Sequence, residues 1–167
     1  MNNVLAWSMN LTEDMFDTAC SMIMSGRTLA PAAFILHMKN MEIFRLIPAW
    51  TTTEEMALFP GKMKKVCDST NPDAVVVMAD FWMKTMPGDT TDEDINALYR
   101  QHCSVKNMPK SVPVLAAFLS MSDGGFYVLR GKIKNIQNHR YVESKEWRSQ
   151  TNMSSPFLPW RTGKSNR

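Results

Sequence analysis

The sequence predicts an α+β protein: a single, largely antiparallel sheet of about five strands packed with two to three helices, which cover one face of the sheet. Three observations lead to this prediction. Residues 73–83, "DAVVVMADFWM", form an apolar run bounded by Asn71-Pro72 and Pro87-Gly88, as expected of a central strand. Two pairs of apolar runs are each joined by a short polar turn, which is typical of antiparallel hairpins. Further segments carry apolar residues at helical spacing.

The first predicted element is a helix over residues 11–26. Thr12 is placed to cap its start, and Gly26 is placed to end it. One face of this helix is apolar and should pack on a sheet; it consists of Met15, Ala19, Met22 and Ile23. After a break at Ala30-Pro31, residues 34–39 and 42–48 should form a hairpin. Charged residues interrupt the alternation of its second strand, so the register of that strand stays open.

A second helix is predicted within residues 51–71, capped by Thr52 or Thr53. Its first turn is acidic and its last turn is basic, as the helix dipole favours. The Pro60-Gly61 pair lies in the middle of this segment. Since proline removes a backbone donor and crowds the preceding turn, we expect the helix to be kinked or split there.

The remaining elements follow the central strand at residues 74–82. A short helix capped near Thr91 is predicted on a long polar connection over residues 86–111. A second hairpin should pair residues 112–121 with residues 125–136 around the Ser122-Asp123-Gly124-Gly125 turn. These elements predict one domain over residues 1–140. Residues 141–167 are predicted to be a basic tail containing Ser and Pro, partly docked through Phe157, Leu158 and Trp160.

Composition excludes several classes of protein. With 167 residues and 44% hydrophobic residues, the chain has the size and composition of one globular domain. No apolar run reaches the ~20 residues that span a bilayer, and the start lacks a basic signal region, so we expect a cytoplasmic protein without membrane contact. The three cysteines are widely spaced, which argues against a disulfide framework and a zinc site. We expect no cofactor and no metal.

Charge is unevenly distributed and raises the possibility of nucleic-acid binding. From Arg130 onward the chain carries nine basic and two acidic residues, whereas its overall net charge is only +3. Basic side chains alternating with aromatic ones can hold phosphates and stack on bases. The candidate binding residues of this segment are Lys132, Lys134, Arg140, Trp147 and Arg148. The competing interpretation is a solvated strand edge whose lysines discourage pairing with other sheets.

Asp80 and Trp82 close the central strand and are the other candidate binding residues. A carboxylate at a strand end can bind a cation or act as a base when a second polar group lies within hydrogen-bond reach. This gives an alternative function, a small hydrolase or metal-dependent enzyme centred on Asp80 with His37 or His102 as its partner. No second acid or histidine stands at a defined spacing from Asp80. The pattern is therefore explained equally simply if Asp80 only ends the strand and has no role in catalysis or binding. We therefore name no catalytic residue.

The order of the elements, together with the segments "APAAFIL", "DAVVVMADFWM" and "VLAAFLSMSDGGFYVLRG", resembles a loose group of small bacterial and phage-type hypothetical proteins. Asp80, Trp82 and Met83 match the acidic-x-Trp-Met ending of the central strand in that group, while Phe81 is bulkier than its pattern expects. The resemblance covers roughly residues 12–130. It implies the α+β fold and no activity.

The sequence favours a non-enzymatic module that binds another protein. Its 15 methionines belong mostly to periodic segments that fill a core, and the remainder suit an adaptable contact surface. A macromolecular protein partner is the main expectation, with nucleic acid as the alternative and a homo-oligomer also considered. By analogy with the resembling group, the module would be a phage or mobile-element inhibitor of a host system.

Overall fold

The computed structural model describes residues 3–102 and 104–149 and has an α+β fold. Its helices and strands follow in the order α1 (Asn3–Met24), β1 (Ala32–His37), β2 (Glu42–Leu46), α2 (Thr53–Thr70), β3 (Ala74–Met83), α3 (Asp92–His102), a 3₁₀ turn (Val105–Asn107), β4 (Val112–Met121), β5 (Phe126–Ile136) and β6 (His139–Ser149). The strands form one six-stranded antiparallel sheet in the order β2-β1-β3-β4-β5-β6.

The central strand and both hairpins are confirmed. β3 pairs with β1 on one side and with β4 on the other, and its first six residues are buried. Its side chains alternate as expected: Val75 and Val77 face one layer of the core, while Val76 and Met78 face the other. A strand that is apolar on both faces thus lies between two covered layers.

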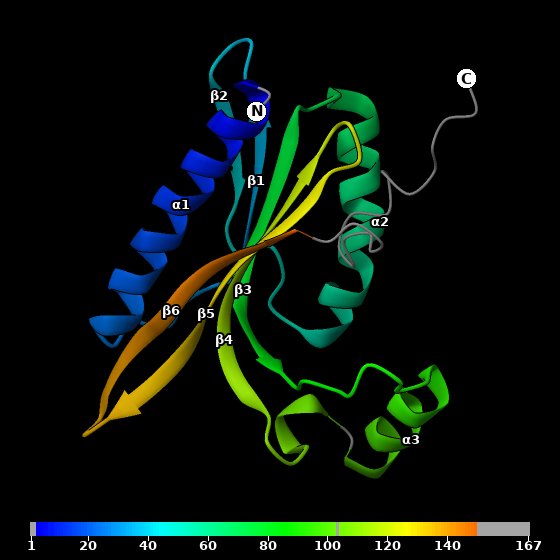
Figure 1. Ribbon diagram of the computed structural model, residues 1–167. Coiled ribbons are helices and arrows are strands. Elements are labelled where there is room, and N and C mark those ends of the chain that lie inside the picture. Colours follow the sequence, from blue (N-terminus) through cyan, green and yellow to red (C-terminus); the bar gives the residue numbers. More distant parts are fainter. Residues whose placement is uncertain (1–2, 103, 150–167) are drawn as a thin grey trace.

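The helices cover both faces of the sheet, and the expectation that they cover one face was wrong. α1 packs Phe16, Ala19 and Ile23 against one face, which we call the α1 face. α2 packs its residues Phe59, Met63 and Cys67 against the opposite face, the α2 face. Figure 1 shows these two helices on opposite sides of the sheet. Each helix brings one apolar stripe, and a sheet that is apolar on both faces needs both stripes.

The start of α1 was predicted too late in the sequence. Thr12 is no cap but a fully buried residue in the middle of the helix, where its hydroxyl donates to the backbone carbonyl of Ser8 at 2.7 Å. A threonine can bond to the preceding turn in this way, so a residue type that favours caps is equally compatible with a helix interior.

α2 runs without a break through Pro60-Gly61, so the predicted split was wrong. The proline leaves one carbonyl in the preceding turn without its helical donor. Packing outweighs this cost, because Phe59, Met63 and Cys67 recur every four residues on the buried side of the helix, spanning the proline. The predicted cap is confirmed, since Thr52 accepts a hydrogen bond from the Glu55 backbone N–H.

The sixth strand lies where a tail was predicted. β6 begins at His139 and pairs with β5 along most of its length, so residues 141–149 belong to the domain. Its charged residues gave it the composition of a tail, although one face of an edge strand can be polar. The remaining tail residues, including Phe157, Leu158 and Trp160, lie outside the described residues. None of the helices in the described part of the chain is long and apolar enough to cross a membrane.

Candidate functional site

Asp80 and Trp82 lie on the α1 face, on the part of β3 that extends beyond β1. The last pair between these strands joins Ala32 to Met78, so β3 continues past the start of β1. Asp80 is exposed, and the described residues supply no ion pair to it. The Trp82 side chain is 41% exposed, and the Lys106 ammonium lies 5.7 Å from its ring centroid. The two candidates are therefore surface residues.

The strand register places one of the two proposed partners of Asp80, His37, far from it. Because Leu36 pairs with Ala74, His37 lies at the opposite end of β3 from Asp80, ~20 Å away at ~3.4 Å per residue. Within residues 3–102 and 104–149, no cluster of three or more His, Cys, Asp or Glu side chains could hold a metal ion. The His37 partner proposed for an Asp80-centred enzyme is thus excluded by the strand register.

The basic candidates do not share one surface. The register of β5 and β6 places Lys132, Lys134 and Arg148 on the α2 face. Trp147 faces α1, with its indole N–H donating to the Glu13 carboxylate at 2.7 Å, and Arg140, opposite Asn135, also belongs to the α1 face. Successive side chains of a strand point to opposite faces of the sheet, so basic residues that are close in sequence need not share one surface.

Several of these charges are already paired. Arg148 lies 3.0 Å from the Glu146 carboxylate, and this contact lowers the pKa of Glu146 below its ordinary value. Lys134 lies 3.8 Å from Glu143. The neighbouring Lys145 reaches across to Asp17 of α1 at 3.0 Å, and this hydrogen bond raises the lysine pKa. The Lys134 and Lys145 contacts link β6 to β5 and to α1. All three contacts leave fewer unpaired basic groups that could bind a phosphate.

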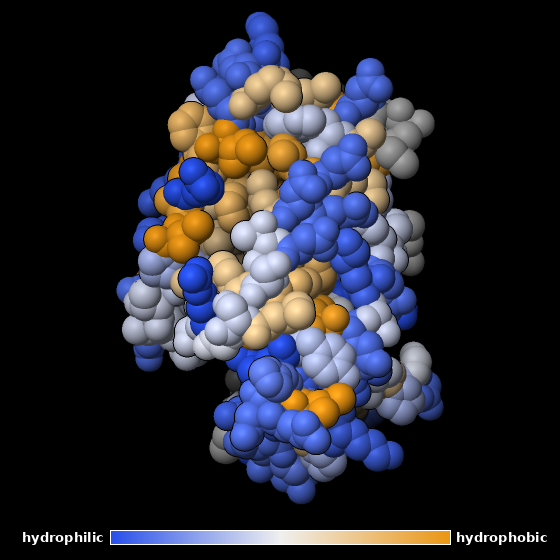
Figure 2. Space-filling view, turned by 90° about the vertical axis from the view of Figure 1, so that its left-hand side faces the viewer, coloured by the Kyte–Doolittle hydropathy of each residue, from blue (hydrophilic) through white to orange (hydrophobic). Residues whose placement is uncertain are grey.

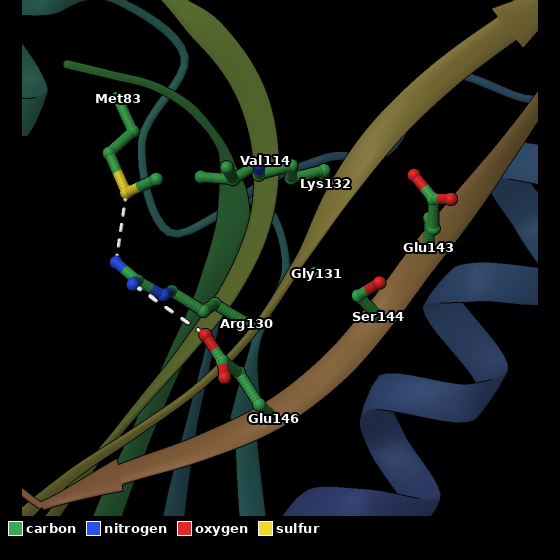
Figure 3. A pocket seen from close by; sticks show the side chains of 8 residues that line it. All are labelled: Met83, Val114, Arg130, Gly131, Lys132, Glu143, Ser144 and Glu146. Carbon is green, nitrogen blue, oxygen red and sulfur yellow. Dashed lines mark hydrogen bonds and ion pairs between the residues drawn. The ribbon is translucent and has the colours of Figure 1, made fainter. Parts of the chain in front are cut away.

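A shallow cavity of about 260 Å³ lies where β6 bulges away from β5. Figure 3 shows Arg130 between Met83 and Glu146, and the arginine lies 2.9 Å from the Met83 sulfur and 3.7 Å from the Glu146 carboxylate. Lys132 and Glu143 also line this cavity. With two basic and two acidic side chains in the lining, the cavity has no net charge with which to select an ion.

An apolar groove of about 320 Å³ lies between α1 and the β1–β2 hairpin. Most of its lining is apolar, and Arg45 supplies its one charged side chain; the lining residues are Met15, Thr18, Ala19, Met22, Thr28, Leu29, Ala30, Ala32, Phe34, Arg45, Ile47 and Met78. Asp80 follows Met78 by two residues on the same face of β3, ~7 Å further along the strand. The groove therefore ends near Asp80, one of the residues that the sequence singled out.

The apolar surface continues from the groove onto β2. Every residue of β2 is exposed; on the α1 face the exposed fractions of Ile43 and of the adjacent Ile47 are 37% and 57%, while Phe44 and Leu46 lie on the α2 face. Figure 2, which views the molecule from the α1 side, shows hydrophobic residues gathered beside the polar outer surface of that helix. Large contiguous apolar surfaces are uncommon on monomeric proteins and mark interaction sites. We call the groove and the α1 face of β2 together the apolar surface.

Sequence reasoning missed this surface. The signal was present in "MEIFRLI", residues 41–47, where apolar residues fall on both faces of a strand whose two charged residues do not alternate. Such a pattern suits a central strand or an interface edge, and only the sheet order shows that β2 is an edge. Three methionines, Met15, Met22 and Met78, line the groove.

No protein-family model matches the chain, and comparison with curated proteins and with solved structures finds none that is significantly similar.

Proposed function

We propose that the protein is a non-enzymatic module that binds another protein through the apolar surface on its α1 face. The observation that carries this proposal is the groove, whose mainly apolar lining includes three methionines and continues into the exposed strand β2. Methionine side chains adapt to differently shaped partners, and the fully desolvated centre of a protein interface is typically apolar.

The chemistry of the groove defines the partner that it would accept. Apolar side chains of a partner segment would fill the groove and displace water from it. Arg45 at the β2 side would pair with a carboxylate of the same segment, since it is the one charged side chain in the lining. The proposed partner is therefore a protein with an apolar, acid-containing segment. Action as a phage or mobile-element inhibitor of a host system is a further proposal, resting on the resemblance alone.

The proposal is tested by capture from a bacterial lysate on immobilised protein, with identification of the retained proteins by mass spectrometry. Met22→Glu places a charge in the groove and should abolish retention of the specific partner. Leu58→Glu is the matched control, because Leu58 is 68% exposed on α2, on the other side of the sheet. A protein retained equally by both variants and by the wild type does not bind the groove. Absence of any protein sensitive to Met22→Glu, at low and at high salt, would overturn the proposal.

The two alternatives receive less support. A nucleic-acid surface would need its basic groups on one face, and the candidates are divided between two faces and partly paired. An enzyme centred on Asp80 would need a concave pocket and a second polar group, whereas Asp80 is exposed and neither of the two cavities described above includes it.

A further inference from the structure

Strand β2 is an edge strand, and three of its five residues are exposed apolar side chains. It bonds to β1 on one side, and no other described strand lies on its outer side. Its apolar side chains point to both faces: the register with β1 places Ile43 on the α1 face, and Phe44 and Leu46 on the α2 face. An exposed apolar edge presents unpaired backbone N–H and C=O groups and acts as a template for another strand.

The opposite edge of the same sheet is protected. β6 carries charged residues on both faces and bulges opposite Gly131, with Ser144 in a left-handed conformation at φ 60°. Charges and bulges are the features by which proteins block pairing at sheet edges. β2 also carries one charged residue on each face, Glu42 and Arg45, but its pairing with β1 has no bulge and three of its five side chains are exposed and apolar, whereas none of the large apolar side chains of β6 is exposed. A partner that covers β2 accounts for the difference.

We propose that a second copy of this chain covers β2, with the two β2 strands antiparallel about a two-fold axis through Phe44. An axis normal to the sheet keeps each α1 face on the same side, so residues that meet must belong to the same face. An axis at Phe44 pairs all five residues of the strand, Glu42 to Leu46, whereas any other position leaves part of it unpaired. An axis at Arg45 would also oppose two arginines, which is unfavourable.

The exposed apolar residues complement one another in this register. The two Phe44 rings meet on the α2 face. On the α1 face Ile43 lies opposite Arg45, whose aliphatic stem can cover it. Met41, which is in the left-handed conformation of the β1–β2 turn, and Ile47 flank the strand and are 66% and 57% exposed in the single chain, so they lie beside the paired strands and not within the pairing. On the α2 face Leu46 lies opposite Glu42, whose short aliphatic part it can contact, so the Phe44 pair is the main apolar contact of this register.

The area available fits a reversible dimer. With ~200 Å² for a fully exposed large side chain, the five apolar residues of this edge offer roughly 500 Å² per copy. The total of ~1,000 Å² is near the lower limit for a specific interface, so we expect association in the micromolar range. The biological role of the dimer rests on the proposed function. The dimer would place two apolar grooves on the same side of one continuous sheet, where they could bind one bivalent partner.

The dimer is tested first by sedimentation or light scattering on the full chain. At ~100 μM a dimer with a micromolar Kd is almost wholly associated, so the wild type should show twice its monomer mass. Phe44→Lys places a charge at the axis and should leave a monomer, whereas Ile136→Lys, at a 57% exposed position on β5, should remain a dimer. A wild type that stays monomeric at this concentration overturns the proposal.

The register is tested by disulfide cross-linking. In Phe44→Cys the two thiols would meet across the axis with Cα atoms ~4.5–5.5 Å apart, within the range of a disulfide. Arg45→Cys is the control, because its two copies would be offset by two residues and ~8 Å apart, too far to bridge. Mild oxidation should link Phe44→Cys into dimers well above the levels of Arg45→Cys and the wild type. Equal linking of both variants would overturn the register.

These experiments separate the two proposals. A wild-type dimer that retains no protein sensitive to Met22→Glu contradicts the proposed function and leaves the dimer standing. A monomer that retains such a protein contradicts the dimer and leaves the function standing. If the monomer also loses that protein on Phe44→Lys, the occupant of β2 is a strand of the other protein and not a second copy.

Discussion

At the scale of single residues, the bulge between β5 and β6 depends on the absence of a side chain at Gly131. The bulge lies between Arg130 and Lys132, and there Gly131 is packed closely against β6. A Cβ atom at this position would lie 2.5 Å from the Val142 side chain and 3.1 Å from the backbone oxygen of Glu143. The backbone oxygen cannot rotate away, so the strands would have to separate.

We predict that Gly131→Ala lowers the free energy of unfolding by ~1–3 kcal/mol, the usual cost of forcing an extra methyl group into packed structure. Gly61→Ala is the control, because a Cβ there meets nothing within 4 Å and Gly61 is an exposed residue inside α2. That change should raise stability by ~0.5–1 kcal/mol through helix propensity. Urea denaturation measures the free energy of unfolding of both variants. An equal decrease in both would contradict the idea that Gly131→Ala acts through the close contact between Gly131 and β6.

At the scale of elements, α2 is held at its start by a network of caps. Thr52 accepts a hydrogen bond from the Glu55 N–H at 3.1 Å. The Glu55 carboxylate in turn accepts from the Thr51 backbone N–H at 2.6 Å and from the Thr51 hydroxyl at 2.8 Å. These bonds favour the ionised carboxylate, and the backbone bond is the main reason that the pKa of Glu55 lies below its ordinary value of 4.5.

We predict that the stabilisation provided by ionised Glu55 is present above pH 4.5 and disappears as the pH falls through the lower folded-state pKa. The sign follows because the folded state binds this proton less readily than the unfolded state. Thermal denaturation should therefore show that the wild type melts at a higher temperature than Glu55→Gln. This difference in melting temperature should be constant near neutral pH and should shrink in acid. Glu54→Gln is the control, since no hydrogen bond to the Glu54 side chain is described. A Glu55→Gln difference that persists unchanged in acid would contradict this account.

At the scale of the whole molecule, the sheet is stable because each face has its own helix. Val76 is fully buried on the α1 face, and Val75 and Val77 are fully buried on the α2 face. Asp80, on the same strand, lies beyond the edge of β1 and is exposed. The two ends of β3 thus differ in their environment, which allows a direct test of where the core ends.

We predict that Val76→Asp is insoluble or melts far below the wild type, because an unpaired buried carboxylate costs several kcal/mol against a domain stability of ~5–15 kcal/mol. Asp80→Asn keeps the side-chain shape at an exposed position and should melt within a few degrees of the wild type, ~0.5 kcal/mol or less. Circular dichroism melts of both purified variants make the comparison. A collapse of the Asp80→Asn fold would mean that this carboxylate belongs to a charged network essential to the structure.

The candidate site could be predicted from the sequence only in part. Asp80 was found because it interrupts an apolar run, and it lies two residues beyond Met78, which lines the apolar groove, whereas Trp82 lies further along the strand. The basic residues of β5 and β6 were predicted as one surface because they are close in sequence, whereas pairing divides them between two faces. Trp147 was expected to be free for stacking, but α1 brings Glu13 to its indole N–H. Contacts between residues so far apart in the chain leave no local signature.

The sequence by itself determined the elements whose signals are local: a central strand at residues 74–82 that is apolar on both faces, two hairpins with polar turns, and a capped helix at Thr52. Only the tertiary structure decided that α2 continues through Pro60, that α1 and α2 take opposite faces, that β6 completes the sheet and that β2 is left as an apolar edge. The physical reason is that periodicity and capping depend on neighbouring residues. Strand order, the side that each helix covers and the position of a groove depend instead on burial energies summed over residues far apart in the chain.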